Sequence, residues 1–387
     1  MEPAVAKTLF TFNFKKLPKA ALIAIALISG LYFIELFVLP IDSLGVYKFH
    51  PRNFRFLSGD FYPNMKVSMT DTGSDLAQHT KYAIKKKVDW ETDRYGYRKR
   101  DLGTEKFQII ILGESNIAGS GLTQEDMLSE VLERRLKMSV YPLTDIKTPL
   151  INIFLNDKRF INNPPRIVIL AVVERYIELL PKPYINNSNT QLFKLGLFIR
   201  RYLDKHPALG ILIDRMSKNS MMHSFVRRIE LGIENPMRRL LGMEDALPPG
   251  SVQSTVDKKW FFFREVVDRM ACGKDVSSEE LDGMAEVIAS YDRIFKEKGI
   301  RFIFLPIPNK ENIYYKYVPV KNLAKPEFLG RLILKLQNMG IEVIDTQKAF
   351  DEASIRSNKL LYCTNDTHLN AAGVVLTADL VEDALKK

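Results

Sequence analysis

The stretch from residue 107 to residue 121 constrains the fold more than any other part of the chain. Five of the six residues from 107 to 112 are apolar, with three consecutive isoleucines among them. A run this short and this apolar predicts a strand buried on both faces, as in parallel α/β sheets. Gly113 ends the strand, and Ser115 follows in the turn before a helical pattern over residues 125–136. The serine is therefore expected at the carboxyl end of a strand, where open α/β sheets bind their ligands.

A second polar motif lies far along the chain, at Asp366-Thr-His368, just before a predicted helix over residues 371–385. Ser115 alone could be no more than a helix cap. With the second motif, the sequence offers an imidazole that takes the hydroxyl proton and a carboxylate that holds its tautomer. We therefore predict Ser115 as nucleophile, His368 as general base and then acid, and Asp366 as the group that orients it. The pair could instead bind a metal, but no further ligand is spaced nearby, so no metal site is predicted.

Other apolar runs indicate further strands of the same sheet. Ile167–Val173 is followed directly by Glu174 and Arg175, which we expect at the same rim as Ser115. The arginine could hold a carboxylate or a developing oxyanion, and a structural Glu/Arg pair is an equally good interpretation. Two more strands are predicted, one in residues 301–310 that runs into a polar loop and one at 341–345, with helices between them. This alternation predicts an α/β fold with a mostly parallel sheet.

Composition excludes several classes of protein. At 387 residues and 46% hydrophobic composition, the chain can bury a sizeable core. Its two cysteines, Cys272 and Cys363, give neither a disulfide framework nor zinc spacing; they could pair in an oxidising compartment or stay as buried free thiols. The net charge of +10 comes without any nucleic-acid module, so a polyanionic carbohydrate or a lipid surface is the expected partner and nucleic acid is not. We predict no cofactor.

The N-terminal region has the pattern of a membrane anchor. Residues 20–39 are a run of twenty whose only charge is Glu35, and Pro40 follows. This length crosses the hydrocarbon core of a bilayer, and the lysines before it hold residues 1–19 in the cytoplasm. We therefore expect a single-pass protein of the cell membrane with an extracytoplasmic catalytic domain. A cleaved signal peptide and a buried core helix are the alternatives. The preceding lysines are Lys7, Lys15, Lys16 and Lys19.

The remaining chain divides into a lead-in and a catalytic region. Residues 40–100 form the lead-in, whose charged stretch 85–100 is expected to be a solvated edge or loop. The catalytic domain is predicted over residues 101–387, interrupted by a helical insert at about 185–255. Because the insert is rich in Lys and Arg, it could cover part of the site or contact a membrane surface or a partner protein.

The Gly-x-Ser turn after the first strand and the Asp-x-His segment before the last helix resemble the SGNH (GDSL-type) hydrolase superfamily of serine esterases and acyltransferases. This resemblance implies a flavodoxin-like three-layer α/β/α sandwich. Residues 173–176, 305–314 and 366–368 are similar to the alginate-type O-acetyltransferase branch, and residues 260–263 resemble it more loosely. Carried over from that branch, Lys310 and Tyr314 would line a sugar groove, with a structural role as the alternative.

The chain also departs from the family pattern. The serine turn reads Gly-Glu-Ser instead of Gly-Asp-Ser. The Asp-x-His segment follows the serine, as in the wider superfamily, whereas in the alginate-type branch it usually comes first. The separate Gly and Asn blocks of the family's oxyanion hole have no clear match. We expect the backbone amides of Ser115 and Asn116, together with Arg175, to take that role.

These features predict a membrane-anchored, serine-dependent O-acyltransferase, and an O-acetyltransferase in particular, that modifies an extracytoplasmic polysaccharide through an acyl-serine intermediate. The resemblance also makes a multi-spanning membrane acyltransferase a possible source of the acyl group. Two alternatives stay open. One is a carbohydrate esterase or deacetylase that uses the same residues. The other is a non-catalytic SGNH-like scaffold in polysaccharide export or modification.

Overall fold

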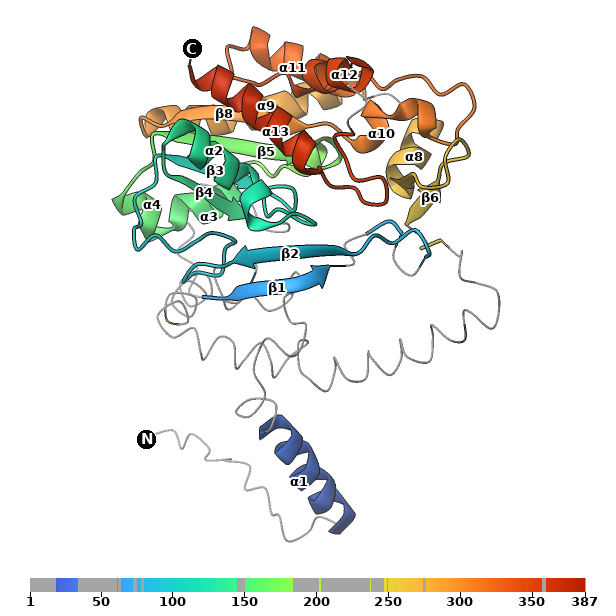
Figure 1. Cartoon of the computed structure of the whole chain (residues 1–387). Helices are drawn as coiled ribbons and strands as arrows, with labels where there is room; N and C mark the ends of the chain where they lie inside the picture. The colour runs from blue at the N-terminus through green and yellow to red at the C-terminus, as the bar shows by residue number, and fades with distance from the viewer. Residues whose placement is uncertain are drawn as a thin grey trace, which may run out of the picture.

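The computed structural model of the chain describes residues 19–33, 61, 64–71, 75–77, 80–144, 150–183, 202, 237, 247–248, 250–273, 276–356 and 360–386. Its centre is a parallel four-stranded sheet in the order β4-β3-β5-β8 (Figure 1). A parallel bridge between Phe304 and Val343 adds one more segment beside β8. This is the strand order of flavodoxin-like folds, with the switch point at β3. The strands are β3 (Ile109–Gly113), β4 (Val140–Thr144), β5 (Ile167–Val173) and β8 (Arg301–Ile307).

Alternating side chains of β3 explain why helices cover both faces of the sheet. Ile109 and Ile111 belong to one hydrophobic core, whereas Ile110 and Leu112 belong to the other. Because both faces are apolar, each must be covered, and the predicted α/β class with a parallel sheet is confirmed. The first core contains residues of α2 (Leu128–Leu136), α12 (Thr346–Arg356) and α13 (Ala371–Leu385); the second contains residues of α3 (Leu150–Asn156), α4 (Lys158–Asn162), α9 (Ser278–Glu297) and α11 (Phe328–Asn338).

Two parts of the sheet differ from the sequence prediction. No strand was predicted at residues 140–144, where Val140–Thr144 form β4 in spite of Pro142. Among the described residues the strand pairs with β3 alone, and an edge strand tolerates a proline because its missing N–H need not serve a second neighbour. The strand predicted at 341–345 is reduced to the bridge at Val343.

The lead-in region is more ordered than a solvated edge. Strands β1 (Lys66–Asp71) and β2 (Lys86–Glu91) pair antiparallel, and Trp90 of β2 is buried. Arg98 and Lys99 are only 5% and 1% exposed. The expectation of a solvated stretch is wrong here because each buried cation has its own partners. Lys99 pairs with Glu130 and Glu133 of α2, and Arg98 donates to backbone carbonyls.

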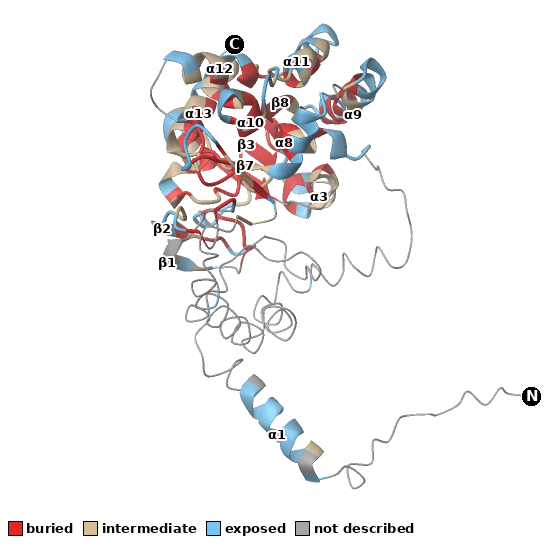
Figure 2. Ribbon diagram, turned by 90° about the vertical axis from the view of Figure 1, so that its right-hand side faces the viewer, coloured by how far each residue is buried: buried red, intermediate tan, exposed pale blue. Residues whose placement is uncertain are grey.

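The N-terminal helix α1 (Lys19–Phe33) is 15 residues long. Within the described ranges, no helix is both long enough and apolar enough to span a membrane. Residues 34–39 of the predicted anchor lie outside the described residues, as does most of the predicted insert at 185–255. The apolar side chains of α1 are largely exposed, Ile23 at 61% and Leu27 at 63% (Figure 2).

Cys272 and Cys363 do not pair: both are free thiols, the first exposed and the second half-buried.

The remaining elements surround the carboxyl ends of the parallel strands. A second antiparallel pair joins β6 (Ser251–Gln253) and β7 (Phe261–Phe263). The short helices are η4 (Gln124–Asp126), η5 (Glu174–Leu179), α8 (Arg264–Ala271), α10 (Lys310–Ile313) and η6 (Tyr315–Tyr317).

Candidate active site

Ser115 lies in a tight turn at the carboxyl end of β3. The amides of Ile117 and Ala118 both donate to the Glu114 carbonyl oxygen, at 2.8 and 2.9 Å. A side chain at Gly113 would place its Cβ 2.3 Å from Cγ1 of Ile117. The glycine therefore lets the turn fold back closely on the strand, and the serine emerges at the switch point of the sheet.

Arg98 of the lead-in holds this turn from outside. Its Nη1 donates to the carbonyl oxygens of Ala118 at 3.1 Å and Gly119 at 2.6 Å, and its Nη2 donates to that of Leu122 at 3.0 Å. The guanidinium also lies 5.2 Å from the centre of the Trp90 ring. Sequence reasoning missed this residue, since its only signal was one arginine in a charged, aromatic stretch.

The three predicted triad residues form one hydrogen-bonded chain. Nε2 of His368 is 2.8 Å from Oγ of Ser115, and Nδ1 is 2.5 Å from Oδ1 of Asp366. The carboxylate side chain of Asp366 is 4% exposed. These contacts assign the imidazole proton to Nδ1, where the carboxylate accepts it, and leave Nε2 as the acceptor that faces the serine hydroxyl.

The electrostatics of the pair suit general base catalysis. Burial lowers the pKa of His368, but the charge of Asp366 and its hydrogen bond outweigh this and raise the pKa above its ordinary value. Burial likewise opposes the charged form of Asp366, yet attraction to His368 and several hydrogen bonds hold the pKa of that carboxyl below its ordinary value. Asp366 therefore stays ionised, and a carboxylate in this position can stabilise an imidazolium at His368.

Lys310 and Tyr314 hold the loop that carries His368. Nζ of Lys310 donates to the carbonyl oxygens of Phe261 and Thr364, both at 2.7 Å, and of Asp366 at 3.1 Å. Burial lowers the pKa of Lys310 to about 8. The hydroxyl of Tyr314 accepts the Leu361 amide at 2.9 Å. Since the three donors of Lys310 are used on backbone carbonyls, the structure favours a structural role over the predicted sugar groove.

Asn116 ties the serine turn to the same loop. Its Oδ1 accepts the backbone amide of Leu369 at 3.0 Å, so the side chain is committed to structure. Its backbone amide and that of Ser115 come before the first hydrogen-bonded amide of the turn, and neither has an acceptor among the described residues. Two free amides at the start of a helical turn can donate to an oxyanion that forms beside Ser115.

Asp75 is a third carboxylate at the site, and nothing in the sequence pointed to it. Its Oδ2 lies 3.9 Å from Nδ1 of His368. Ligand atoms of Asp75, Asp366 and His368 all lie within 4.8 Å of one another, which corrects the expectation that the pair has no further metal ligand nearby. A cation bound to both groups would have to displace the proton between His368 and Asp366, so the triad describes this geometry better.

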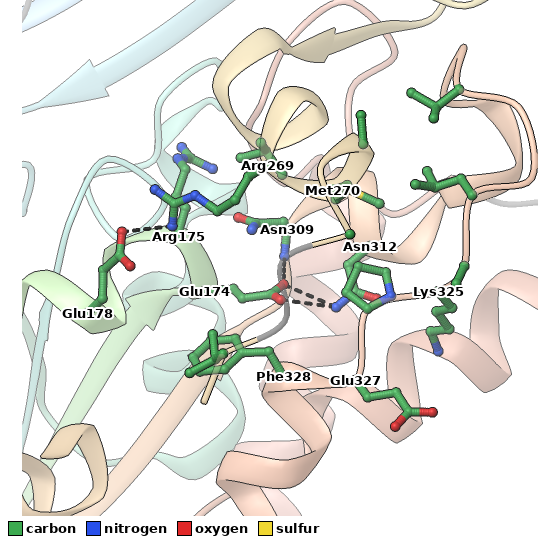
Figure 3. A pocket seen from close by; sticks show the side chains of 18 of the residues that line it. Glu174, Arg175, Glu178, Arg269, Met270, Asn309, Asn312, Lys325, Glu327 and Phe328 are labelled. Atoms are coloured by element: carbon green, nitrogen blue, oxygen red, sulfur yellow. Dashed lines mark hydrogen bonds and ion pairs between the residues drawn. The ribbon is translucent and has the colours of Figure 1, made fainter. Parts of the chain in front are cut away.

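Glu174 lines a cavity of about 500 Å³ beside the carboxyl ends of β5 and β8 (Figure 3). Its carboxylate accepts the Asn309 amide at 2.7 Å and Nδ2 of Asn312 at 3.2 Å to each oxygen. Burial raises the pKa of Glu174 to about 7. These contacts differ from the Glu/Arg pair that the sequence suggested for Glu174 and Arg175.

Arg175 lines the cavity and is near enough to the triad for its charge to act on His368. Its guanidinium carbon is 4.7 Å from the Tyr176 ring, and its charge lowers the pKa of His368. Ser115, Asp366 and His368 are not among the described residues of the cavity wall. The structure therefore brings Ser115, Asn116, Asp366, His368 and Arg175 together, whereas Glu174 faces the adjoining space.

Comparison with protein families gives a match to the C-terminal third of the chain. Residues 256–387 match the model of the SGNH hydrolase-like domain, acetyltransferase AlgX. The matched residues contain Asp366 and His368 but not Ser115, and the match confirms the resemblance found in the sequence. No curated protein matches the chain.

Four chains of solved structures match distantly, two of them as follows. A crystal structure of TesA matches at 10% identity with a TM-score of 0.35, over 72% of this chain and 97% of TesA. A GDSL-like lipase from Bacteroides thetaiotaomicron matches at 10% identity with a TM-score of 0.32, over 74% of this chain and 91% of the lipase. The α/β fold class therefore rests on the strand order, and the resemblance to the SGNH hydrolase-like domain rests on the family match.

Proposed function

We propose that this chain is a serine-dependent O-acyltransferase that acetylates a polysaccharide. The proposal starts from the match of residues 256–387 to the SGNH hydrolase-like domain. The observation that carries the proposal is the chain of hydrogen bonds from Ser115 through His368 to Asp366. A serine hydroxyl is a weak nucleophile at neutral pH, and an adjacent imidazole held by a carboxylate is what activates it.

In the first half of the reaction, Oγ of Ser115 attacks the carbonyl carbon of an acyl donor while Nε2 of His368 takes the hydroxyl proton. The backbone amides of Ser115 and Asn116 stabilise the oxyanion, and the positive charge of Arg175 adds to them. When the tetrahedral intermediate collapses, the bond to the leaving group breaks and His368 returns the proton to that group. An acyl-serine ester remains.

In the second half, a sugar hydroxyl attacks the acyl-serine and gives its proton to His368, which returns it to Oγ of Ser115. The cavity beside Arg175 offers space for the sugar, and its volume of about 500 Å³ suits a small ligand. Water in place of the sugar would make the chain an esterase with the same residues, so the acceptor decides between the two activities.

The proposal includes a membrane anchor at the N-terminus and a catalytic domain outside the cytoplasm. It is supported by the apolar run 20–39, by the lysines before it, and by the exposed apolar side chains of α1. A multi-spanning membrane acyltransferase would then be well placed to supply the acyl group. Recovery of the full-length chain from the soluble fraction without detergent would refute the anchor.

The catalytic proposal is tested by intact mass of the full-length chain after brief exposure to an activated acetyl ester. We expect one acetyl adduct on the wild type, none on Ser115→Ala, and little on His368→Ala, since loss of either residue costs roughly 10³–10⁶ in rate. Ser120→Ala, in the same turn, is the matched control and should be acetylated normally. Wild-type adduct formation by Ser115→Ala would refute the proposal.

Transfer and hydrolysis are separated by the fate of the acetyl group. With donor and an oligosaccharide present, the proposal predicts acetylated sugar in excess of free acetate. Free acetate alone would establish the esterase. The non-catalytic scaffold would be favoured if the wild type is not acylated and Ser115→Ala supports polysaccharide export or modification as well as the wild type does.

A further inference from the structure

Asp75 lies against the segment that carries the general base and its carboxylate. One carboxylate oxygen accepts the backbone amide of Thr367 at 2.9 Å, and the other accepts the Thr367 hydroxyl at 2.6 Å. Thr367 is the residue between Asp366 and His368. Asp75, which precedes Ser115 in the sequence, therefore holds the middle residue of the Asp366–His368 segment.

The backbone next to Asp75 is well packed. Leu76 and Ala77 are 3% and 0% exposed, and both pack against Phe261 in a small hydrophobic cluster. The carboxylate itself is 39% exposed. A carboxylate on a fixed backbone, bonded through both oxygens, is a stationary charge, which distinguishes Asp75 from a mobile surface aspartate.

We propose that Asp75 is a positioning residue of the triad, which fixes the Asp366–His368 segment through Thr367 and strengthens His368 as a base by its negative charge. This inference rests on the proposed function, because it takes His368 to be the general base. Asp366, hydrogen-bonded directly to Nδ1, keeps the role of orienting the imidazole. Asp75 acts on the same imidazole from 3.9 Å and does not touch the reacting atoms.

The charge of Asp75 depends on pH. It is faced by Asp366 and His368, with Lys310 and Lys86 near Asp366, so the two carboxyls titrate as a coupled pair. Desolvation, and then the charge of Asp366, raise the pKa of Asp75 to about 6. Below that pH Asp75 is neutral and can donate a hydrogen bond to Asp366. Above it, the second negative charge faces the imidazole and favours the imidazolium.

Asp75→Asn in the full-length chain tests the inference, because the amide keeps an acceptor for Thr367 and a donor for Asp366 while it removes the charge. We expect the NMR titration of the His368 imidazole, and the acid limb of kcat/KM against pH, to move down by roughly 1 unit, as for one charge at this distance in a polar medium. Asp89→Asn, an exposed aspartate of β2, is the matched control and should move neither. Asp75→Glu keeps the charge and should retain the wild-type titration.

An unchanged His368 titration in Asp75→Asn would overturn the inference. If that variant fails to fold, Asp75→Ser decides the question by the same measurement: a titration equal to that of the wild type overturns the inference, and a lowered one supports it. The NMR titration needs no turnover. A shifted His368 pKa in a chain that accepts no acetyl group would therefore support the role of Asp75 while it refutes the proposed function.

Discussion

The serine turn and the base loop, residues 361–370, reach the same site by different means. The turn is formed by a strand end, a glycine and local backbone hydrogen bonds, with Arg98 as an outside clamp. The loop contains a single bridge, Tyr362 to Leu369, and is held by side chains from three distant segments. Ser115 is thus placed mainly by local sequence, and His368 by distant residues. These side chains are Asp75, Asn116, and Lys310 together with Tyr314.

The largest contrast in stability should come from Gly113, at the serine turn, and Gly373, which lies in α13 and packs against the base loop. A Cβ at Gly373 would lie 2.2 Å from the backbone oxygen of Leu361, whereas one at Gly113 mainly meets the side chain of Ile117. A side chain can move aside and backbone cannot. Gly373→Ala should therefore cost about 3 kcal/mol of unfolding free energy or more, and Gly113→Ala about 1–3 kcal/mol.

Urea unfolding of the full-length variants measures both costs. The matched control is Gly283→Ala on helix α9, where no atom lies within 4 Å of the added Cβ. This change should stabilise the chain by about 0.5–1 kcal/mol because alanine favours helix. Equal losses for Gly113→Ala and Gly373→Ala would contradict the contrast between the two regions.

Lys310, which holds the base loop, and Arg98, which holds the serine turn, should differ in how they affect catalysis. Lys310→Met leaves three buried carbonyls without a donor, partly offset by no longer burying an ammonium, and should cost about 2–3 kcal/mol. Because it frees the Asp366 backbone, it should also move the acid limb of the pH profile. Arg98→Met loosens only the serine turn, so it should lower kcat at every pH and leave the limb in place.

Full pH profiles of kcat/KM distinguish the two effects. Lys316→Met and Arg100→Met are the matched controls, since both side chains are exposed and lie close in sequence to the residues tested. If Arg98→Met moved the limb as far as Lys310→Met does, the turn and the loop would not be separate units.

A smaller effect is expected at Glu174, which belongs to neither region. Its pKa is raised from 4.5 to about 7 by burial, so the folded chain holds a proton that the unfolded chain has lost. Stability should then fall as pH rises through this window, by about 2 kcal/mol between pH 5.5 and 7.5. Glu174→Gln should remove that slope, as measured by urea unfolding at the two pH values. A slope that persists in the variant would assign it to another group.

The contrast between local and long-range contacts also explains how much of the structure could be predicted from the sequence. Ile167–Val173 and the helix Ala371–Leu385 were predicted to the residue, because an apolar run and a helical pattern are local signals. Ser115, Asp366 and His368 came together as expected, although their catalytic roles stay a prediction.

The missed residues have no local signal. Asp75 and Arg98 act through partners far along the chain, and in sequence they resemble ordinary surface charges. Lys310 matched a family motif, but only its three carbonyl partners show that it is a buried clamp. A side chain whose role is to join two segments cannot be identified before both segments are placed.

The hydrogen bonds of His368 to Ser115 and of Leu369 to Asn116 each close a loop of 253 residues. Contacts of such high sequence separation form late in folding, because most of the chain must be ordered before they repay the entropy of closing the loop. During synthesis, the serine turn can fold long before residue 368 is added. If Ser115 is the nucleophile, as proposed, it has no base on the growing chain, and its acylation must wait until residue 368 is in place.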